Sequence, residues 1–301
     1  MIFTKNQVSN LMNIIDFTTS MFIVTQMGED VLSTYDKYIL NKFGFDVKKV
    51  VEKYPPYLQS FMFGRLTSWL SDNQASQIVY KDFEKYLKSG QYFPLTTKEK
   101  NLYNISINRS YSHIKNLAEK RKGVLQTSIT EEDVRREISE GIKNRTSKQR
   151  IISNWGNKTG DWQRDYLRIA ETEHNDIFQL GRVAQIEERS GNQAQIYKHV
   201  FPGACRHCIR LYMNGGINGV PKLFTVEELM ANGTNIGRKV ADWLPVVGST
   251  HPFCRCNNHE KDPDERWDEE KHQFVLPEKY EQKIKRTKKN KLTVGDKVFW
   301  V

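Results

Sequence analysis

The chain has 301 residues, a hydrophobic fraction of 38% and a formal net charge of +10. Its length and its 15 Phe, 13 Tyr and 6 Trp residues are enough to build a buried core, which excludes an intrinsically disordered protein. The most apolar N-terminal stretch, 11–24, contains Asn13 and Asp16, so the sequence predicts neither a membrane span nor a secretory signal. We therefore expect synthesis in a reducing cytoplasm. The basic surface either attracts polyanions such as nucleic acid or serves solubility alone.

Residues 1–145 are predicted to form an α-helical region without a sheet, because apolar residues recur there with helical rather than alternating spacing. Thr96 and Glu99 have the spacing of a capping box, in which two side chains satisfy free backbone N–H groups at a helix start. We interpret the apolar stripes as helix-packing core that carries no chemistry, in a region that docks on a protein partner. The stripes fall in 31–39, 58–70, 79–87, 103–117 and 134–142.

The polar segment 143–160, which contains two glycines, predicts a hinge or domain boundary before a long amphipathic helix at 161–189. Glu173 falls on the apolar face of that helix, and a bare buried carboxylate is energetically costly. Three roles stay open for Glu173: it reaches water at the edge of an interface, it anchors the helix to the following module, or it is a catalytic acid. Arg168 and Thr172 lie beside it and are expected to share the structural role.

The four cysteines of the chain all lie between positions 205 and 256, in the patterns Cys205-x-x-Cys208 and His251-x-x-Cys254-x-Cys256. In a reducing compartment such a cluster indicates metal ligands rather than disulfides. A C-x-x-C turn offers two corners of the tetrahedron that zinc prefers, and the second pattern supplies the others. The sequence therefore predicts one structural Zn2+.

Five candidate ligands compete for four corners. Either His251 joins Cys205, Cys208 and one of the last two cysteines, or all four cysteines bind and His251 supports a ligand from outside. His207 lies between the first two cysteines and is expected to point outward. A hydrolytic zinc site keeps an open position, and neither H-E-x-x-H nor the deaminase signature occurs in the sequence. We therefore expect a closed site without catalysis.

Between the two patterns, glycines suggest turns around short strands, and Thr225 with Glu228 predicts the start of a short helix. The fold class that follows is mainly α, with a helical N-terminal region and a small α+β module clamped by zinc. We divide the chain into the helical region 1–145, the zinc module 146–260 and a charged tail 261–301.

The tail is split by charge, with an acidic stretch at 260–270 followed by a basic run. A basic run is either a solvated tail or a non-specific contact with the phosphates of nucleic acid, and the latter weakens steeply with salt. The last residues, 292–301, alternate enough to predict one strand. The candidate phosphate contacts are Lys283, Lys285, Arg286, Lys288, Lys289 and Lys291.

The segment 147–256 resembles the Mu F-like minor head, or head-morphogenesis, protein family of tailed bacteriophages. The resemblance rests on R-x-A-x-T-E at 168–173, on Gly181, and on the C-x-x-C and H-P-x-C-R-C patterns in this order. One departure is the segment 244–250, where the family is typically proline-rich and this chain has a single proline. The N-terminal region resembles the family only in being helical.

The resemblance implies a low-copy structural protein of the virion, inside the capsid near the portal vertex, that is made in the host cytoplasm and aids assembly and DNA packaging or ejection. It implies the portal protein or other capsid proteins as partners, non-specific contact with DNA, no membrane and no enzymatic activity. Two alternatives stay open. One is a zinc-stabilised DNA-binding protein unconnected with virions, and the other is a nuclease or transferase that uses Glu173 and His251.

Overall fold

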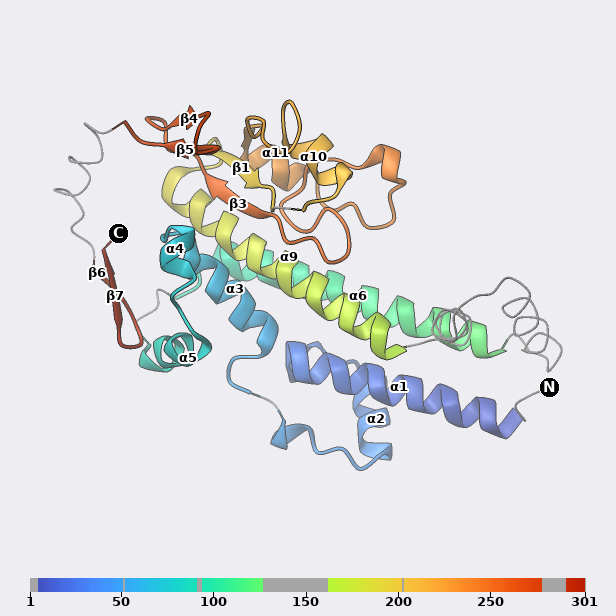
Figure 1. The fold of residues 1–301 in the computed structure, drawn as a ribbon. Coiled ribbons are helices and arrows are strands. Elements are labelled where there is room, and N and C mark those ends of the chain that lie inside the picture. The colour runs from blue at the N-terminus through green and yellow to red at the C-terminus, as the bar shows by residue number, and fades with distance from the viewer. Residues whose placement is uncertain are drawn as a thin grey trace, which may run out of the picture. The chain divides into compact units, whose positions relative to one another are not determined.

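The computed structural model describes residues 5–50, 52–90, 94–126, 162–201, 203–277 and 291–300. Within them, long helices fill the chain up to Ser190, and the strands all follow that residue (Figure 1). The predicted fold class is confirmed, because a helical N-terminal region precedes a small strand-containing part with a Cys/His cluster. None of the described helices is long and apolar enough to cross a membrane.

The helices begin and end largely where the sequence signals predict. At the start of α6, the Glu99 amide donates to Thr96 Oγ1 (3.2 Å) and the Thr96 amide to Glu99 Oε2 (2.8 Å), so the capping box is confirmed. The expected helix at 134–142 and the expected hinge at 143–160 lie outside the described residues. The larger helices are α1 (Lys5–Met27), α2 (Thr34–Lys42), α3 (Pro56–Thr67), α5 (Tyr80–Ser89), α6 (Thr97–Gln126) and α9 (Trp162–Ser190), with short turns at η1 (Glu29–Val31), η2 (Val47–Lys49) and α4 (Asp72–Ala75).

The chain forms two compact units. One consists of Met1–Tyr57 with Ile105–Ala170, and the other of Leu58–Asn104 with Glu171–Val301. In the first unit a buried carboxylate joins three helices: Asp36 of α2 accepts hydrogen bonds from Ser20 of α1 (2.6 Å) and Lys115 of α6 (2.9 Å). Burial alone raises the pKa of Asp36, but hydrogen bonds from Ser20, Ser33 and Lys115 lower it to about 2. The residue is therefore ionised and fully paired at neutral pH.

The second unit carries the described strands. Its three-stranded antiparallel sheet has the order β2-β1-β3, with β1 at Gln195–His199, β2 at Phe224–Thr225 and β3 at Asn257–Glu260. Short helices α10 (Arg206–Tyr212) and α11 (Val226–Ala231) and the turn η3 (Val240–Asp242) lie in the connections. The predicted cap of α11 is confirmed, since the Glu228 amide donates to Thr225 Oγ1 at 3.1 Å. A separate two-stranded sheet pairs β4 (Arg266–Asp268) with β5 (Gln273–Val275).

The prediction of one strand at 292–301 is wrong. The segment folds back on itself as a hairpin, β6 (Lys291–Val294) paired with β7 (Lys297–Trp300), because Gly295 turns the chain at a φ of 61°. The hairpin packs on α5, where Lys297 pairs with Asp82 (2.8 Å) and Asp296 with Lys85 (2.7 Å).

Within the second unit, α3 and α9 touch backbone to backbone at two glycines. A Cβ added to Gly64 would lie 2.0 Å from the Phe178 carbonyl oxygen, and a Cβ added to Gly181 would lie 2.1 Å from that of Phe61. No side chain fits at either position without separating the helices. The glycine at 181 therefore has a packing role.

We expect Gly181→Ala to lower the free energy of unfolding by about 3 kcal/mol, because the new methyl group overlaps the α3 backbone. Gly123→Ala is the matched control: it places the same methyl group on a helix with nothing within 4 Å, and it should leave stability unchanged or raise it. Urea denaturation of both variants checks the prediction. Equal stability of the two would contradict the close helix contact.

His174 of α9 also faces α3, with Nδ1 2.7 Å from Ser60 Oγ. Burial lowers the pKa of His174 from 6.5 to about 4, against the opposing effect of the Glu173 charge. Between pH 6.5 and about pH 4, His174 is therefore protonated in the unfolded chain and neutral in the folded chain. Its contribution to the free energy of unfolding is complete above the unfolded pKa of 6.5 and is lost as the pH falls toward the folded pKa of about 4.

Acidification from neutral pH to about pH 5 is expected to cost about 2 kcal/mol of folding free energy at this one residue. The measurement is urea denaturation across that pH range, on the wild type and on His174→Gln under the same metal conditions. The His174→Gln variant should lose about 2 kcal/mol less free energy of unfolding than the wild type over the same pH range. A parallel pH dependence in the two proteins would exclude the role of His174.

Candidate metal centre

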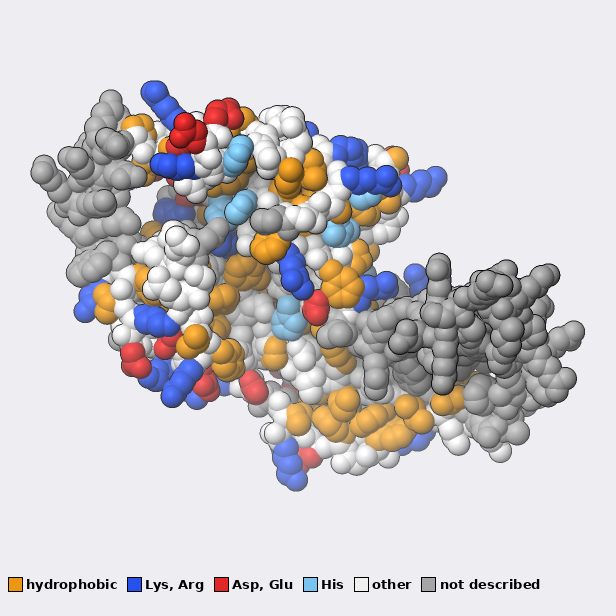
Figure 2. All heavy atoms as spheres, in the orientation of Figure 1, with side chains coloured by type: hydrophobic (Ala, Val, Ile, Leu, Met, Phe, Trp, Pro, Cys, Tyr) orange, Lys and Arg blue, Asp and Glu red, His pale blue; other side chains and the backbone are white. Residues whose placement is uncertain are grey.

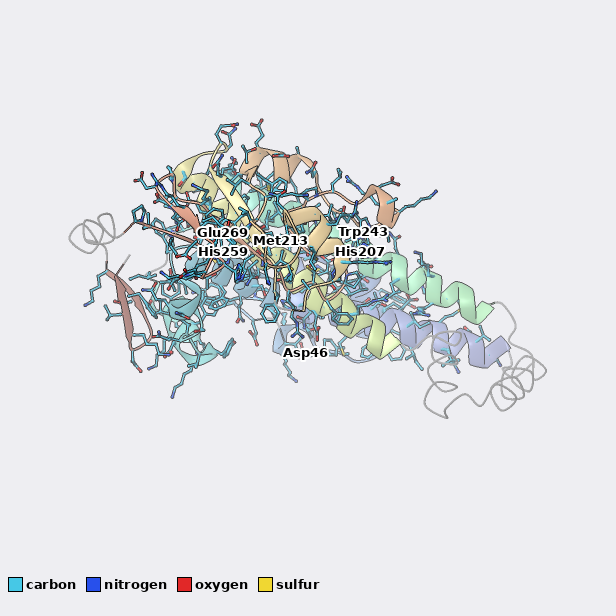
Figure 3. The ribbon with its side chains drawn as sticks, turned by 45° about the horizontal axis from the view of Figure 1, so that its top comes forward. Asp46, His207, Met213, Trp243, His259 and Glu269 are labelled. Carbon is cyan, nitrogen blue, oxygen red and sulfur yellow. The ribbon has the colours of Figure 1, made fainter. Side chains whose placement is uncertain are left out.

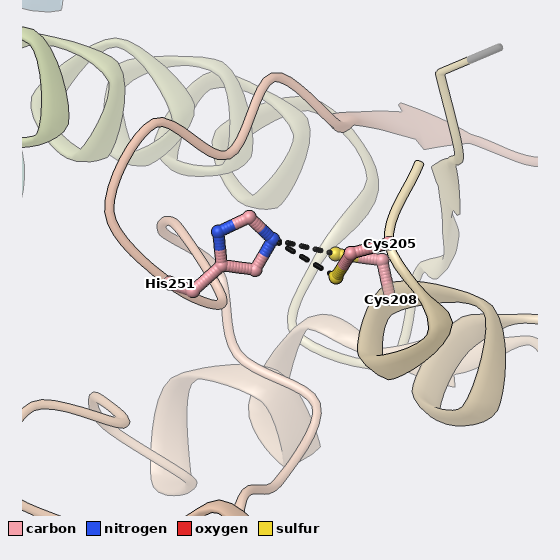
Figure 4. Close-up of side chains that lie close together, drawn as sticks. All are labelled: Cys205, Cys208 and His251. Atoms are coloured by element: carbon pink, nitrogen blue, oxygen red, sulfur yellow. Dashed lines mark hydrogen bonds between the residues drawn. The ribbon is translucent and has the colours of Figure 1, made fainter. Parts of the chain in front are cut away.

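The structure brings the five candidate ligands to one place in the second unit. Cys205 caps the N-terminus of α10 and Cys208 lies in its first turn, while His251, Cys254 and Cys256 lie in the segment that leads into β3. His251 Nε2 is 3.1 Å from the Cys205 sulfur and 3.5 Å from the Cys208 sulfur (Figure 4). The Cys208 sulfur is also 3.8 Å from that of Cys254.

These distances suit the corners of a small tetrahedron, whose sulfurs lie about 3.8 Å apart when each metal–sulfur bond is about 2.3 Å. Two overlapping groups of donors are close enough to share an ion, and Cys208 belongs to both. One group is Cys205, Cys208 and His251, and the other is Cys208, Cys254 and Cys256. The cluster can therefore hold a metal ion, and both predicted choices of the fourth ligand stay open.

The buried sulfur atoms share their protons unevenly. Hydrogen bonds from Cys208 and Cys256 hold the pKa of the Cys254 thiol below its ordinary value, and the same bond raises the pKa of Cys208, its donor. Three of the four cysteines are buried, so these protons are shared within the cluster rather than with water. A metal ion replaces such protons directly, because a thiolate is the form that binds it.

The imidazole of His251 is oriented for metal binding. Its Nδ1 lies 2.8 Å from the carbonyl oxygen of Pro252, which can only accept, so Nδ1 carries the proton and Nε2 presents its lone pair to the sulfurs. The Trp243 ring stacks on the His251 ring with 6.3 Å between their centroids. The His207 ring packs edge-on against the same tryptophan, with 5.2 Å between centroids (Figure 3). His207 thus contacts Trp243, and it does not belong to either group of candidate metal donors.

Four polar residues of α9 bind the backbone of residues 246–256 and the start of β3. We call these residues, Thr172, Asn175, Asp176 and Gln179, the polar stripe, and we call 246–256 the ligand segment. Thr172 Oγ1 accepts a hydrogen bond from the Phe253 amide (3.3 Å), and Asn175 Nδ2 donates to the Cys254 carbonyl oxygen (3.1 Å). Asp176 Oδ1 accepts from the Ser249 amide (2.6 Å), and Gln179 Oε1 accepts from the Asn258 amide (2.9 Å). The stripe therefore positions the second ligand pattern through its backbone.

The three residues of the predicted structural motif lie at different depths. Glu173 is 2% exposed, so the alternative in which it merely reaches water is wrong. Thr172 is partly buried and contacts the ligand segment directly, whereas Arg168 is exposed. A structural role for all three stays a prediction. Of the predicted phosphate contacts, Lys283 to Lys289 lie outside the described residues, and Lys291 is exposed at the start of β6.

Two features of the site escaped the sequence reasoning although signals for them exist. Asn175, Asp176 and Gln179 follow Thr172 at helical spacing, which places all four on one face. Lys198 occupies an inward position of β1, between the buried residues Ile196 and Val200. Both patterns break the rule that buried positions are apolar, so apolar periodicity alone does not reveal them.

Comparison with protein families, with curated proteins and with solved structures gave no match to this chain.

Proposed function

We propose that the four cysteines and His251 supply the ligands of one structural zinc ion, and that the chain is a non-enzymatic minor head protein of a tailed bacteriophage. The observation that carries the proposal is that the two halves of the resemblance meet in space. Thr172 of R-x-A-x-T-E accepts a hydrogen bond from Phe253 of H-P-x-C-R-C. The patterns are thus parts of one structural centre, which supports reading them together.

The donor chemistry supports a structural rather than a catalytic ion. Thiolate sulfur is a soft donor that suits zinc among the common divalent ions. Four or five protein donors leave no position for a water molecule, and several thiolates reduce the Lewis acidity that hydrolysis requires. The ion would join α10 to the ligand segment, and the sheet lies directly beyond that segment. Its effect is therefore expected on stability.

In this proposal the protein lies inside the capsid near the portal vertex and aids assembly and DNA packaging or ejection. The portal or another capsid protein is the expected partner of the first unit. Support for such a surface comes from α2 and its end, where Tyr35, Tyr38 and Phe43 are 47%, 58% and 42% exposed. Large aromatic side chains at the surface are typical of protein-binding sites.

The purified chain is expected to contain one zinc ion, and a strong chelator should lower its melting temperature sharply. Cys208→Ser, at the position common to both donor groups, should lose the ion. His207→Asn is the matched control, since this neighbouring residue is not a grouped donor and the variant should keep it. Native mass spectrometry and thermal melting give both readouts. A metal-free wild type whose melting temperature ignores the chelator would refute the proposal.

A second candidate function, binding of DNA, is favoured by the surface around the metal centre. Its exposed cations are Arg206, Arg210, Arg238, Lys239 and Arg255. Arg210 donates to the carbonyl oxygen of Val240 and Arg238 to that of Asn232. None of the five cations pairs with a carboxylate of the described part of the chain. In Figure 2, several Lys and Arg side chains lie beside the region of α10, to its right in this view. Uncompensated positive charge of this kind attracts phosphates.

Arg210→Ala combined with Lys239→Ala is expected to weaken DNA binding at low salt and to reduce its salt dependence by about one ion per lost phosphate contact. The pair Lys48→Ala and Lys49→Ala removes the same charge from the first unit and should have a smaller effect. Fluorescence anisotropy with duplex DNA measures both. Removal of residues 283–289 separates the contribution of the basic run, and equal losses in the two double variants would exclude a specific surface.

Virion composition separates the two candidate functions. The head-protein proposal expects the chain in purified particles, at low copy beside the portal protein. Tight DNA binding by a chain that mass spectrometry cannot detect in such particles would favour the DNA-binding protein instead.

A further inference from the structure

Residues 235–244, between α11 and the ligand segment, form a closed surface loop. The side chain of Asn235 joins its two ends, since Nδ2 donates to the Leu244 carbonyl oxygen (2.9 Å) and Oδ1 accepts from the Leu244 amide (3.0 Å). Within the loop, Trp243 Nε1 donates to the carbonyl oxygen of Arg238 (3.3 Å). Compact loops whose ends meet in this way are Ω-loops, which frequently carry function.

The loop turns three large apolar side chains toward the solvent. Ile236, Val240 and Leu244 are 44%, 45% and 40% exposed. A single exposed apolar residue needs no explanation, but three on one short loop form a group that is typical of a protein-binding surface. Aliphatic side chains contribute little to the binding of a phosphate backbone, so they favour a protein partner over nucleic acid at this place.

Cations lie among these apolar side chains. Arg238 and Lys239 are exposed within the loop, and Arg210 of α10 lies beside it, because its Nη2 donates to the Val240 carbonyl oxygen at 3.2 Å. The loop has one carboxylate, Asp242. None of the three cations pairs with a carboxylate of the described part of the chain. We call the following residues the loop face: Arg210, Ile236, Arg238, Lys239, Val240 and Leu244.

The same chain carries a surface of opposite charge in the hairpin of β4 and β5. The stretch 260–270, which contains β4, has seven carboxylates and two cations. Asp268 holds the tip of the hairpin, since its Oδ1 accepts from the amides of Glu270 (3.0 Å) and Lys271 (2.9 Å). Glu269 and Glu270 are exposed at this tip, and neither pairs with a cation among the described residues. The hairpin thus presents ordered, uncompensated negative charge.

The two surfaces lie apart within one copy of the chain. In Figure 3, Met213 lies between Glu269 of the hairpin and Trp243 of the loop. Figure 2 shows acidic side chains at the upper left, at the position of β4 in Figure 1, and a group of Lys and Arg side chains at the upper right. No contact joins the two surfaces within the described residues, so each is left to meet another molecule.

We propose that copies of this chain associate through the loop face of one copy and the β4–β5 hairpin of the next. The charges of the two surfaces are complementary, and the partly exposed Trp267 of β4 offers an aromatic side chain to the apolar part of the loop face. A contact between two different surfaces is heterologous, so it repeats head to tail and either closes into a ring or continues as a filament.

The net charge of +10 opposes this association only at long range. At physiological ionic strength the repulsion between two copies is screened beyond about 8 Å, whereas charges in direct contact are screened much less. Both surfaces are also held in shape by their own hydrogen bonds, which lowers the entropic cost of binding. Local complementarity therefore decides whether two copies stay together.

Sedimentation velocity of the nuclease-treated full chain tests the proposal. The mean mass of the wild type should rise with protein concentration and fall when salt is added. Arg210→Glu with Lys239→Glu, and Glu269→Lys with Glu270→Lys, should each weaken association at least about tenfold, because each variant sets like charges against each other. The matched control is Lys48→Glu with Lys49→Glu, which makes the same change of charge as the loop variant at exposed positions of the first unit and should associate like the wild type.

An equimolar mixture of the loop variant and the hairpin variant gives the sharper result. Each carries the charges that the other now lacks, so the mixture should regain the association that both have lost, and this recovery also shows that both are folded. If a reversal variant does not fold, Arg210→Gln with Lys239→Gln or Glu269→Gln with Glu270→Gln replaces it and should weaken association in the same direction.

Three outcomes overturn the proposal: a wild type that stays monomeric at every concentration, surface variants that associate like the wild type, and a mixture that stays monomeric. A loop variant that loses binding of duplex DNA while wild-type association is absent assigns the cations to DNA instead. None of these outcomes bears on the proposed zinc site, since no candidate ligand is changed.

Discussion

Hydrogen bonds from the polar stripe of α9 to the backbone of the ligand segment hold the second unit together. The segment 246–256 has no regular secondary structure, yet several of its residues are buried. Buried backbone groups need partners, and a segment without its own ladder has to find them elsewhere. Thr172, Asn175 and Asp176 supply them from one helix, and Gln179 continues the row to the outer side of β3 at Asn258. The helix thereby fixes the backbone on both sides of Cys254.

Local signals explain which parts of the molecule were predictable. Helix periodicity, the capping box at Thr96, the N-cap at Thr225 and the clustering of the cysteines are read within a few residues, and the described residues show each of them. At Thr225 the reciprocal bond from the Glu228 side chain is not among the contacts, so only half of the predicted box forms. The roles of the polar stripe and of Lys198 depend on partners about 50 to 80 residues away, which no local period encodes. The C-terminal hairpin is different: Gly295-Asp296 is a recognisable tight turn, and alternation alone concealed it.

The site combines two kinds of residue that serve one purpose. The thiols and the imidazole form a cluster that can hold a metal ion, and the groups around it fix the tautomer of His251 and the backbone of the ligand segment. Such a division of labour is typical of metal sites that stabilise a fold.

The bond between Gln179 and the amide of Asn258 has a consequence for self-association. β3 is an outer strand of its sheet, and an open strand edge invites pairing with another copy of the same chain. The Gln179 side chain occupies that edge, since its oxygen accepts from the Asn258 amide at 2.9 Å and its nitrogen donates to Asn257 at 2.6 Å. An amide side chain thus stands where the next strand would begin. The Gln179 side chain thereby opposes the pairing of a further strand with β3 at this position.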